Sequence, residues 1–325
     1  MAILISVCVI TYNHENYIRA CLDSILSQQL QGDLEVIVRD DASTDGTATI
    51  LLEYATRYPG IVTVVPTVRN IGANANLLAT FSASTGEFIA VCEGDDYWTD
   101  TQKLARQLAC AREMPTVNFF THPATAGDEH NHEQRFWPCQ ASPSFSVSDI
   151  LSHLGQFAPT ASYFFRRSVL SLLPTWFPHA PIGDFFMEMY FTGQGKGYSC
   201  PEIMSKYRTF SVGSWDDVIK KDRTGEKGVR AYRLMKVFLK KASPDFKGFE
   251  PYFEKRLVML NFAIAHQYMK VGNYSGFLRY MNKAGTHVQE ISRGAAFLFK
   301  VRYIKPVVLV LYNLKKLSAY AKTFL

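Results

Sequence analysis

The first 92 residues alternate between apolar strand-like segments and amphipathic helical segments, and no other feature constrains the fold as strongly. Residues 3–10 are almost continuously apolar, which is typical of a strand buried on both faces of a parallel sheet. The periodicity predicts further strands at residues 34–38, 61–65 and 88–92, and helices at residues 18–26, 47–58 and 77–84. This alternation predicts an α/β fold in which helices sandwich a mostly parallel sheet.

The pattern changes along the rest of the chain. Residues 161–165 and 203–207 predict short strands, and residues 185–191 predict the start of a helix. Residues 123–146 lack periodicity and contain Pro, Gly and His, so they predict a loop or a lid-like excursion. After residue 218 the sequence predicts helices only. We therefore expect an α/β domain over residues 1–217 and an all-helical C-terminal region over residues 218–325.

Composition narrows the class of protein. Hydrophobic residues make up 47% of the 325 residues and charged residues 20%, which excludes a disordered chain. No apolar run reaches about twenty residues, and the first ten residues resemble a strand and not a signal peptide, so we expect a cytoplasmic protein. The six cysteines lack CxxC spacing, which argues against disulfides and zinc. No dinucleotide-binding fingerprint or P-loop motif follows a predicted strand.

Polar residues follow the predicted strands at the points where the strands end. The residues at these points are Thr11, Tyr12 and Asn13, then Asp40 and Asp41, then Arg69 and Asn70, and finally Glu93, Asp95 and Asp96. Ligands of open α/β sheets bind beyond the carboxyl ends of the strands. The sequence therefore predicts a ligand site on this edge of the sheet.

Three of these segments carry a family resemblance. Residues 6–13 read SVCVITYN, residues 40–47 read DDASTDGT and residues 93–98 read EGDDYW. In order and spacing they resemble the opening strand, the DDxSxDxT segment and the DxD-type motif of family 2 glycosyltransferases of the bacterial surface polysaccharide type. The resemblance implies a GT-A Rossmann-like fold, with a nucleotide-sugar half at residues 1–115 and an acceptor half at residues 116–217. It also implies inverting transfer of a sugar from a nucleotide-diphosphate donor to a saccharide or lipid-linked acceptor, with no nucleic acid partner.

The resemblance assigns nucleotide-sugar contacts to the first three strand ends. Tyr12 offers an aromatic face to the base, and Thr11 and Asn13 offer hydrogen bonds from the same loop. Asp40 matches the family residue that accepts from base or ribose, since a carboxylate is an acceptor only. Arg69 lies where the family contacts nucleotide or phosphate. The alternatives are that Tyr12 only packs over the next helix and that Arg69 is only solvated.

The fourth strand ends in a cluster of carboxylates. Adjacent negative charges repel and raise a pKa unless a cation compensates, so Glu93, Asp95 and Asp96 predict a metal site, with Asp95 also near the diphosphate. Oxygen ligands suit Mg²⁺ or Mn²⁺, and such a divalent cation would stabilise the charge of the departing nucleotide. The alternative is an acidic helix cap, which accounts for Asp100 but not for the cluster before it.

Two later segments also resemble the family. Asp184 resembles the catalytic carboxylate that takes the proton of the acceptor hydroxyl, although it could instead only cap the helix that follows. Arg208 and Trp215 resemble a segment that closes over the donor, where the arginine would neutralise phosphate and the tryptophan would stack on a sugar. Phe210 stands where many relatives carry a metal-binding histidine, so the third protein ligand of the metal is not identified.

The C-terminal tail interleaves basic and apolar residues over residues 293–322. This pattern suits a peripheral contact with an anionic membrane surface on the cytoplasmic face of the inner membrane, and it equally suits a packed helix with a solvated basic face. Two other functions stay open. A nucleotidyltransferase would need a glycine-rich basic loop after the first strand, where the chain has Thr11 to Glu15. A non-catalytic nucleotide-sugar-binding scaffold is suggested by Phe210.

Overall fold

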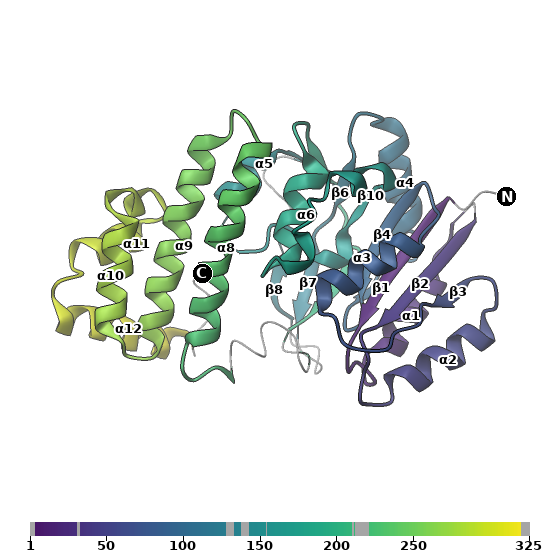
Figure 1. Cartoon of the computed structure of the whole chain (residues 1–325), viewed down its shortest axis with the longest axis horizontal. Coiled ribbons are helices and arrows are strands. Elements are labelled where there is room, and N and C mark those ends of the chain that lie inside the picture. Colours follow the sequence, from purple (N-terminus) through teal and green to yellow (C-terminus); the bar gives the residue numbers. More distant parts are fainter. Residues whose placement is uncertain are drawn as a thin grey trace. The chain divides into compact units, whose positions relative to one another are not determined.

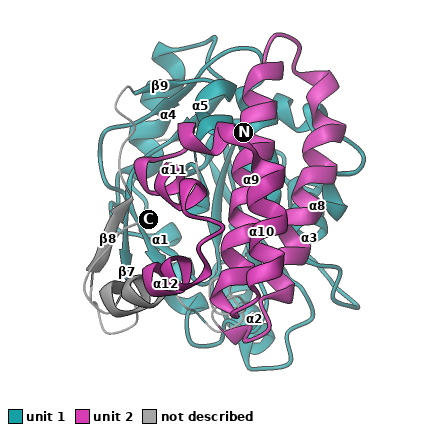
Figure 2. Cartoon of the chain, turned by 90° about the vertical axis from the view of Figure 1, so that its left-hand side faces the viewer, with its two compact units in different colours: residues 1–218 teal, residues 219–325 magenta. Residues whose placement is uncertain are grey.

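The computed structural model describes residues 4–30, 33–127, 133–137, 143–153, 155–209, 211 and 221–319. The chain divides into two compact units, Met1–Val218 and Ile219–Leu325, coloured separately in Figure 2. Among the described residues, strands occur only in the first unit, and the second unit consists of helices joined by short connections (Figure 1).

The larger sheet of the first unit has eight strands in the order β3-β2-β1-β4-β10-β6-β11-β9. These strands are β1 (Ile5–Thr11), β2 (Leu34–Asp40), β3 (Val62–Val64), β4 (Phe88–Glu93), β6 (Phe119–Thr121), β9 (Ser144–Phe145), β10 (Phe164–Arg166) and β11 (Gly197–Ser199). The first four lie parallel to one another, and β10 then pairs antiparallel with both β4 and β6. The sheet is therefore parallel where the chain alternates strand and helix, and mixed beyond β4.

The register of β1 aligns the ends of three neighbouring strands. Thr11 lies opposite Asp40 of β2, and Ile10 lies opposite Glu93 of β4. Every residue of β1 is buried, as its continuous apolar run predicts for a central strand. Parallel pairing thus brings the polar residues that follow these strands to one edge of the sheet.

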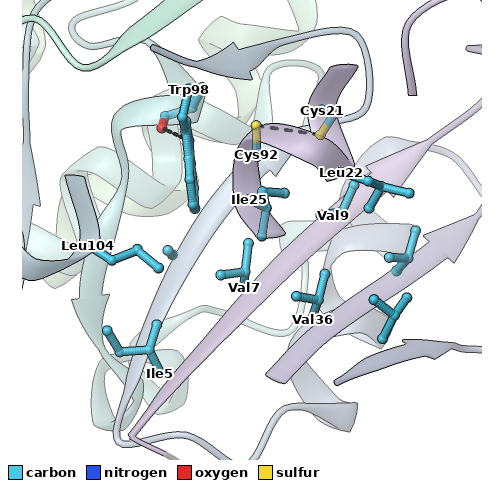
Figure 3. Close-up of a cluster of buried hydrophobic side chains, with 14 of the residues drawn as sticks. Ile5, Val7, Val9, Cys21, Leu22, Ile25, Val36, Cys92, Trp98 and Leu104 are labelled. Atoms are coloured by element: carbon cyan, nitrogen blue, oxygen red, sulfur yellow. Dashed lines mark hydrogen bonds between the residues drawn. The ribbon is translucent and has the colours of Figure 1, made fainter. Parts of the chain in front are cut away.

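Helices cover both faces of this sheet. They are α1 (Ile18–Leu26), α2 (Thr47–Arg57), α3 (Ala73–Ala83), α4 (Lys103–Glu113), α5 (Val147–Ser152) and α6 (Gly183–Thr192), with 3₁₀ turns η1 (Thr160–Ser162), η2 (Arg167–Leu172) and η3 (Phe177–His179). On one face, Ile25 of α1 and Leu104 of α4 lie in one buried cluster with Val7 and Val9 (Figure 3), and α2 adds Leu51 to that cluster. On the other face Phe81 of α3 meets Phe165 of β10 edge to face. This arrangement confirms the predicted α/β fold.

A smaller sheet corrects the prediction of a loop over residues 123–146. Its strands pair in the order β5 (Tyr97–Trp98), β12 (Ser205–Arg208), β7 (Ala124–Gly127) and β8 (Glu133–Trp137). Within the described part of residues 123–146, β7, β8 and β9 are strands, so the loop prediction is wrong there. The reason is that β7 pairs with β12, about 80 residues later in the chain, and such a distant partner leaves no periodicity in the local sequence.

The second unit is a set of helices around its own core. The elements are α8 (Glu226–Ala242), η4 (Ser243–Asp245), α9 (Glu250–Lys270), α10 (Tyr274–Ala284), η5 (Thr286–Glu290), α11 (Arg293–Lys300) and α12 (Lys305–Ala319). Ile264, Phe277 and Met281 are fully buried in this core. The prediction of an all-helical C-terminal region is confirmed for residues 221–319. None of the helices in the described part of the chain is both long and apolar enough to cross a bilayer.

Candidate active site

The ends of β1 and β2 form two interlocked turns. Asn13 adopts a positive φ of 57°, and its side-chain oxygen accepts from the amide of Thr44 at 2.8 Å. The amide of Asn13 donates to the hydroxyl of Ser43 at 2.7 Å, and Asp40 accepts from the amide of Ser43 at 3.1 Å. Ala42 also has a positive φ, of 61°, which is uncommon for a residue with a Cβ. Asn13 and Asp40 therefore shape the rim of the site.

The first two residues after β1 face different surroundings. Thr11 is buried, and its hydroxyl has no hydrogen-bond partner among the described residues. Tyr12 has 42% of its surface exposed, which is unusual for a large aromatic residue beside a buried strand. The exposed ring of Tyr12 suits a planar ligand such as a nucleobase, whereas the Thr11 hydroxyl is packed against Gly94.

Asp41 holds the loop that carries Arg69. Its two carboxylate oxygens accept from the amides of Ile71 at 2.9 Å and Gly72 at 2.8 Å. The buried guanidinium of Arg39 lies 3.7 Å from the same carboxylate. Arg69 itself is exposed on this loop. Arg69 thus lies on the rim, on a segment that Asp41 holds in place. The sequence predicts Asp41 at this edge of the sheet but assigns it no role.

The acidic turn after β4 is packed tightly against β1. A Cβ at Gly94 would lie 2.9 Å from atoms of Thr11 and His14, so only glycine allows this approach. His14 Nε2 lies 4.0 Å from the carboxylate of Asp95, which also accepts a hydrogen bond from the hydroxyl of Ser211. The turn therefore presents the partly buried carboxylate of Asp95 next to the start of the Thr11–Asn13 loop.

Arg208 places a positive charge over this turn. Its guanidinium lies 4.9 Å from the ring centre of Tyr97 and 5.2 Å from that of Tyr17, and one of its nitrogens donates to the backbone oxygen of Asp95 at 3.3 Å. Two aromatic faces hold the guanidinium without neutralising its charge. Arg208 can therefore still pair with an anionic ligand beside the acidic turn.

Asp184 lies in the first turn of α6, and a close helix contact fixes its position. A Cβ at Gly183 would overlap the side-chain amide of Asn74, which donates to the backbone oxygen of Ala180 at 2.7 Å. Asp184 accepts from the amide of Phe185 at 3.1 Å, so part of the predicted capping alternative is present. Burial raises the pKa of the Asp184 carboxyl above its ordinary value, as a proton acceptor at neutral pH requires.

Glu93 shows that Asp184 and the acidic turn are neighbours. Burial, and then the negative charges of Asp95 and Asp184, raise the pKa of Glu93 to about 8, while a hydrogen bond with Thr160 opposes this shift. The carboxyl of Glu93 is therefore mostly protonated at neutral pH. Three acidic residues that are separated in sequence by up to 91 positions thus share one region of electrostatic interaction.

Glu188 is a part of this region that the sequence analysis missed. It is fully buried on α6, one turn after Asp184, and accepts from the amide of Ala158 at 2.9 Å and from the hydroxyl of Tyr163 at 2.8 Å. Burial and the charge of Asp184 raise its pKa to about 8. The signal in the sequence is a single glutamate inside the apolar run FFMEMYF. His14, Thr160 and Ser211 were also missed.

The predicted metal ligands occupy three different environments. Asp96 is buried and accepts from the amide of Arg208 at 2.8 Å, and burial followed by the nearby acids raises its pKa well above the ordinary value. Glu93 is held by Thr160, which leaves Asp95 as the carboxylate best suited to a cation. No group of three His, Cys, Asp or Glu side chains in the described part of the chain could hold a metal by itself. The donor set fits a cation that a bound diphosphate would share with Asp95.

Two of the predicted residues cannot be placed. Trp215 and Phe210 lie outside the residues that the structure describes. The roles predicted for Thr11, Tyr12, Asn13, Asp40 and Arg69, for Asp95, Asp184 and Arg208, and for the metal set stay predictions.

Comparison with known proteins gives sequence relatives and structural neighbours. An uncharacterized protein of Mycobacterium tuberculosis is 36% identical over 217 residues, which cover 65% of this chain and 60% of that protein. The chain thus spans about 60% of the length of the relatives of this kind that it matches. The poly(ribitol-phosphate) beta-glucosyltransferase of Bacillus spizizenii is 36% identical over 94 residues, or 29% of this chain and 15% of that enzyme.

Solved structures share the fold. Residues 1–349 of TarS from S. aureus, in complex with UDP-GlcNAc, match with a TM-score of 0.66 at 17% identity, covering 96% of this chain and 92% of that one. The mannosyltransferase PcManGT from Pyrobaculum calidifontis, with GDP-Man and Mn²⁺, matches with a TM-score of 0.55 at 18% identity, covering 98% and 88%. These neighbours confirm the predicted GT-A-like fold. Glycosyl transferase family 2 matches residues 6–172, which is more than half of the chain, and the protein belongs to that family.

Proposed function

We propose that this protein is an inverting glycosyltransferase that moves a sugar from a nucleotide-diphosphate donor to a saccharide or lipid-linked saccharide in surface polysaccharide or glycolipid assembly. One observation carries the proposal. Asp184 on α6 and Asp95 after β4 both act electrostatically on Glu93, so a candidate base and a candidate diphosphate site lie in one region. Family membership and the nucleotide-sugar complexes of the structural neighbours support the donor class.

The donor would bind along the edge formed by β1, β2 and β4. Tyr12 supplies an exposed ring for the base, while Asp40 and Asn13 supply acceptors at the adjacent turns. Arg208 supplies positive charge next to Asp95. A divalent cation shared by Asp95 and the diphosphate would add Lewis-acid stabilisation of the leaving group.

Asp184 would take the proton of the attacking acceptor hydroxyl. As that oxygen forms its bond to the anomeric carbon, the bond between this carbon and the diphosphate oxygen breaks on the opposite face, which inverts the anomeric configuration. The raised pKa of Asp184 favours proton uptake. The neighbouring Glu93, neutral below a pH of about 8, adds no full second charge beside the base.

The test separates binding from transfer. A panel of nucleotide sugars with Mn²⁺, Mg²⁺ or chelator, read by mass spectrometry, identifies the donor and the metal dependence together. The change Asp184→Asn should then lower transfer by about 10²–10⁴-fold while donor affinity stays within a few-fold. The change Asp222→Asn, at a half-buried loop residue of the second unit, is the matched control. Near-normal turnover of Asp184→Asn would remove Asp184 as the base.

We also propose that the protein works at the cytoplasmic face of the membrane, with a peripheral contact through α11 and α12. Phe297 of α11 and Val310 of α12 are exposed, as is Ile304 just before α12, while Leu298 and Phe299 belong to the helical core. Because the same stretch supplies core residues, truncation would damage the fold, and substitution is the better test. Replacing Phe297, Ile304 and Val310 by Gln should reduce flotation with phosphatidylglycerol vesicles. The same three-residue change at Leu52, Val68 and Ile203 should not, and equal flotation of both variants would contradict the contact.

A further inference from the structure

The two compact units carry opposite net charge. Residues 219–325 contain 22 lysines and arginines against 6 acidic residues, a formal net charge of +16, whereas residues 1–218 contain 13 against 23, a net charge of −10. The modest value of +6 for the whole chain conceals this difference. An excess of positive charge on one unit indicates an anionic partner for that unit.

Part of this charge is gathered on α8 and α10, two helices that both pack against α9. Arg233, Lys236 and Lys240 follow the three- and four-residue spacing of one face of α8, and Lys283 projects from α10. Burial, followed by the charges of Lys283, Lys240 and Arg233, lowers the pKa of Lys236. These four side chains therefore act on one another, and we call them the α8–α10 basic cluster.

Neutral groups hold the cluster in place. Arg233 donates to the hydroxyls of Tyr280 and Tyr268, both at 2.8 Å. Lys236 donates to the side-chain oxygen of Asn261 at 2.6 Å. In the described part of the chain, no carboxylate forms an ion pair with any of these four cations. Hydroxyl and amide groups thus position Arg233 and Lys236 and leave their charges uncompensated.

Uncompensated like charges on neighbouring helix positions cost folding free energy. An anion bound at the cluster would offset that cost. From Arg233 to Lys240 the cluster extends for about 10 Å along α8, at 1.5 Å per residue, which is longer than a single phosphate or carboxylate. The length of the cluster suits a polymer that carries several negative charges along its chain.

We propose that the α8–α10 basic cluster binds an anionic saccharide chain, as a docking surface for the acceptor. The choice of a saccharide as the source of the anions rests on the proposed function, whereas anion binding itself does not. Tyr280 is buried and Tyr268 is partly buried, with ring centres 5.7 Å apart, so the two rings form a packed support for Arg233 beneath the cluster. Leu234 and Val237 are exposed on α8 beside the cluster, so vesicle flotation is needed to distinguish a saccharide from a membrane surface.

Binding to dextran sulfate, with neutral dextran of the same length as reference, tests the proposal on the full chain. The cluster variant carries Arg233→Gln, Lys236→Gln, Lys240→Gln and Lys283→Gln. The control variant carries Arg223→Gln, Lys247→Gln, Lys255→Gln and Lys270→Gln, and so removes the same charge elsewhere on the unit. We expect the cluster variant to bind dextran sulfate about tenfold or more weakly, with a reduced salt dependence, and the control to stay within about twofold of wild type.

Each other outcome counts against the proposal. Equal weakening of both variants would reduce the effect to net charge, and equal binding of neutral dextran would remove the role of the anions. Tighter cluster-dependent binding of single-stranded DNA of equal charge would reject a saccharide partner. Loss of flotation with phosphatidylglycerol vesicles only in the cluster variant would assign the surface to lipid. Because Asp184→Asn should bind dextran sulfate normally, failure of the proposed catalytic function would be recognised separately.

Discussion

The carboxylate of Asp96 accepts a hydrogen bond of 2.8 Å from the backbone amide of Arg208, 112 residues later in the chain. This bond joins the acidic turn after β4 to the end of β12, in the smaller sheet. It also fixes the backbone from which the Arg208 guanidinium reaches the ring of Tyr97 and the backbone oxygen of Asp95. The second aspartate of the DxD-type motif thus has a structural partner in the protein itself.

Replacing Asp96 separates this structural role from a metal role. Asp96→Asn keeps an oxygen acceptor for the Arg208 amide and should unfold near the wild-type temperature. Asp96→Ala leaves that amide unpaired and should lose about 1–3 kcal/mol of the free energy of unfolding. If Asp96→Asn keeps its stability but loses Mn²⁺-dependent donor binding, then Asp96 is a metal ligand as the sequence predicts.

Replacing Gly183 should displace the candidate base. In Gly183→Ala the added methyl group overlaps the side-chain amide of Asn74, so α6 or the Asn74 side chain must move. We expect a loss of about 1–3 kcal/mol in stability and a larger relative loss in turnover than in donor affinity. The double variant with Asn74→Ala should recover part of the stability because it removes the overlap. Wild-type turnover in Gly183→Ala would show that the position of α6 is not critical.

Asp41 should matter more for stability than for chemistry. Asp41→Ala removes the acceptor of two backbone amides and the carboxylate nearest to the buried Arg39, so it should cost about 3 kcal/mol in urea unfolding. Asp41→Asn keeps the shape but offers one oxygen in place of two, and should fall between Ala and wild type. Donor affinity should decline in the same order because the loop carries Arg69. Equal stability of all three proteins would contradict the role of Asp41 in holding the loop.

The sequence predicts the parallel half of the fold well because its signals are local. The continuous apolar run of β1 requires neighbours on both sides, and parallel pairing then places Thr11, Asp40 and Glu93 at one edge without further information. The strand β7 was missed because its partner β12 lies about 80 residues away. Likewise, the role of Glu188 depends on its contacts with Ala158 and Tyr163, which the local sequence does not reveal. The same holds for His14, which packs beside Gly94.

The buried carboxyl of Glu188 predicts a specific dependence of stability on pH. Its pKa is raised from 4.5 to about 8 by burial and by Asp184, so between these values the folded protein keeps a proton that the unfolded chain releases. The stabilisation is therefore complete below pH 4.5 and is lost as the pH rises to about 8, with a slope of up to about 1.4 kcal/mol per pH unit.

Glu188→Gln does not titrate but can still accept from Ala158 and Tyr163. The stability of this variant relative to wild type should rise from pH 5 to pH 8 and then level off, because above that range Glu188 is ionised in both the folded and the unfolded wild type. Glu93 and Asp184 titrate in both proteins and therefore drop out of the difference. Turnover above pH 8 should also persist further in the variant, since no second charge then forms beside Asp184. A constant difference in unfolding free energy across this pH range would show that Glu188 is already ionised in the folded protein.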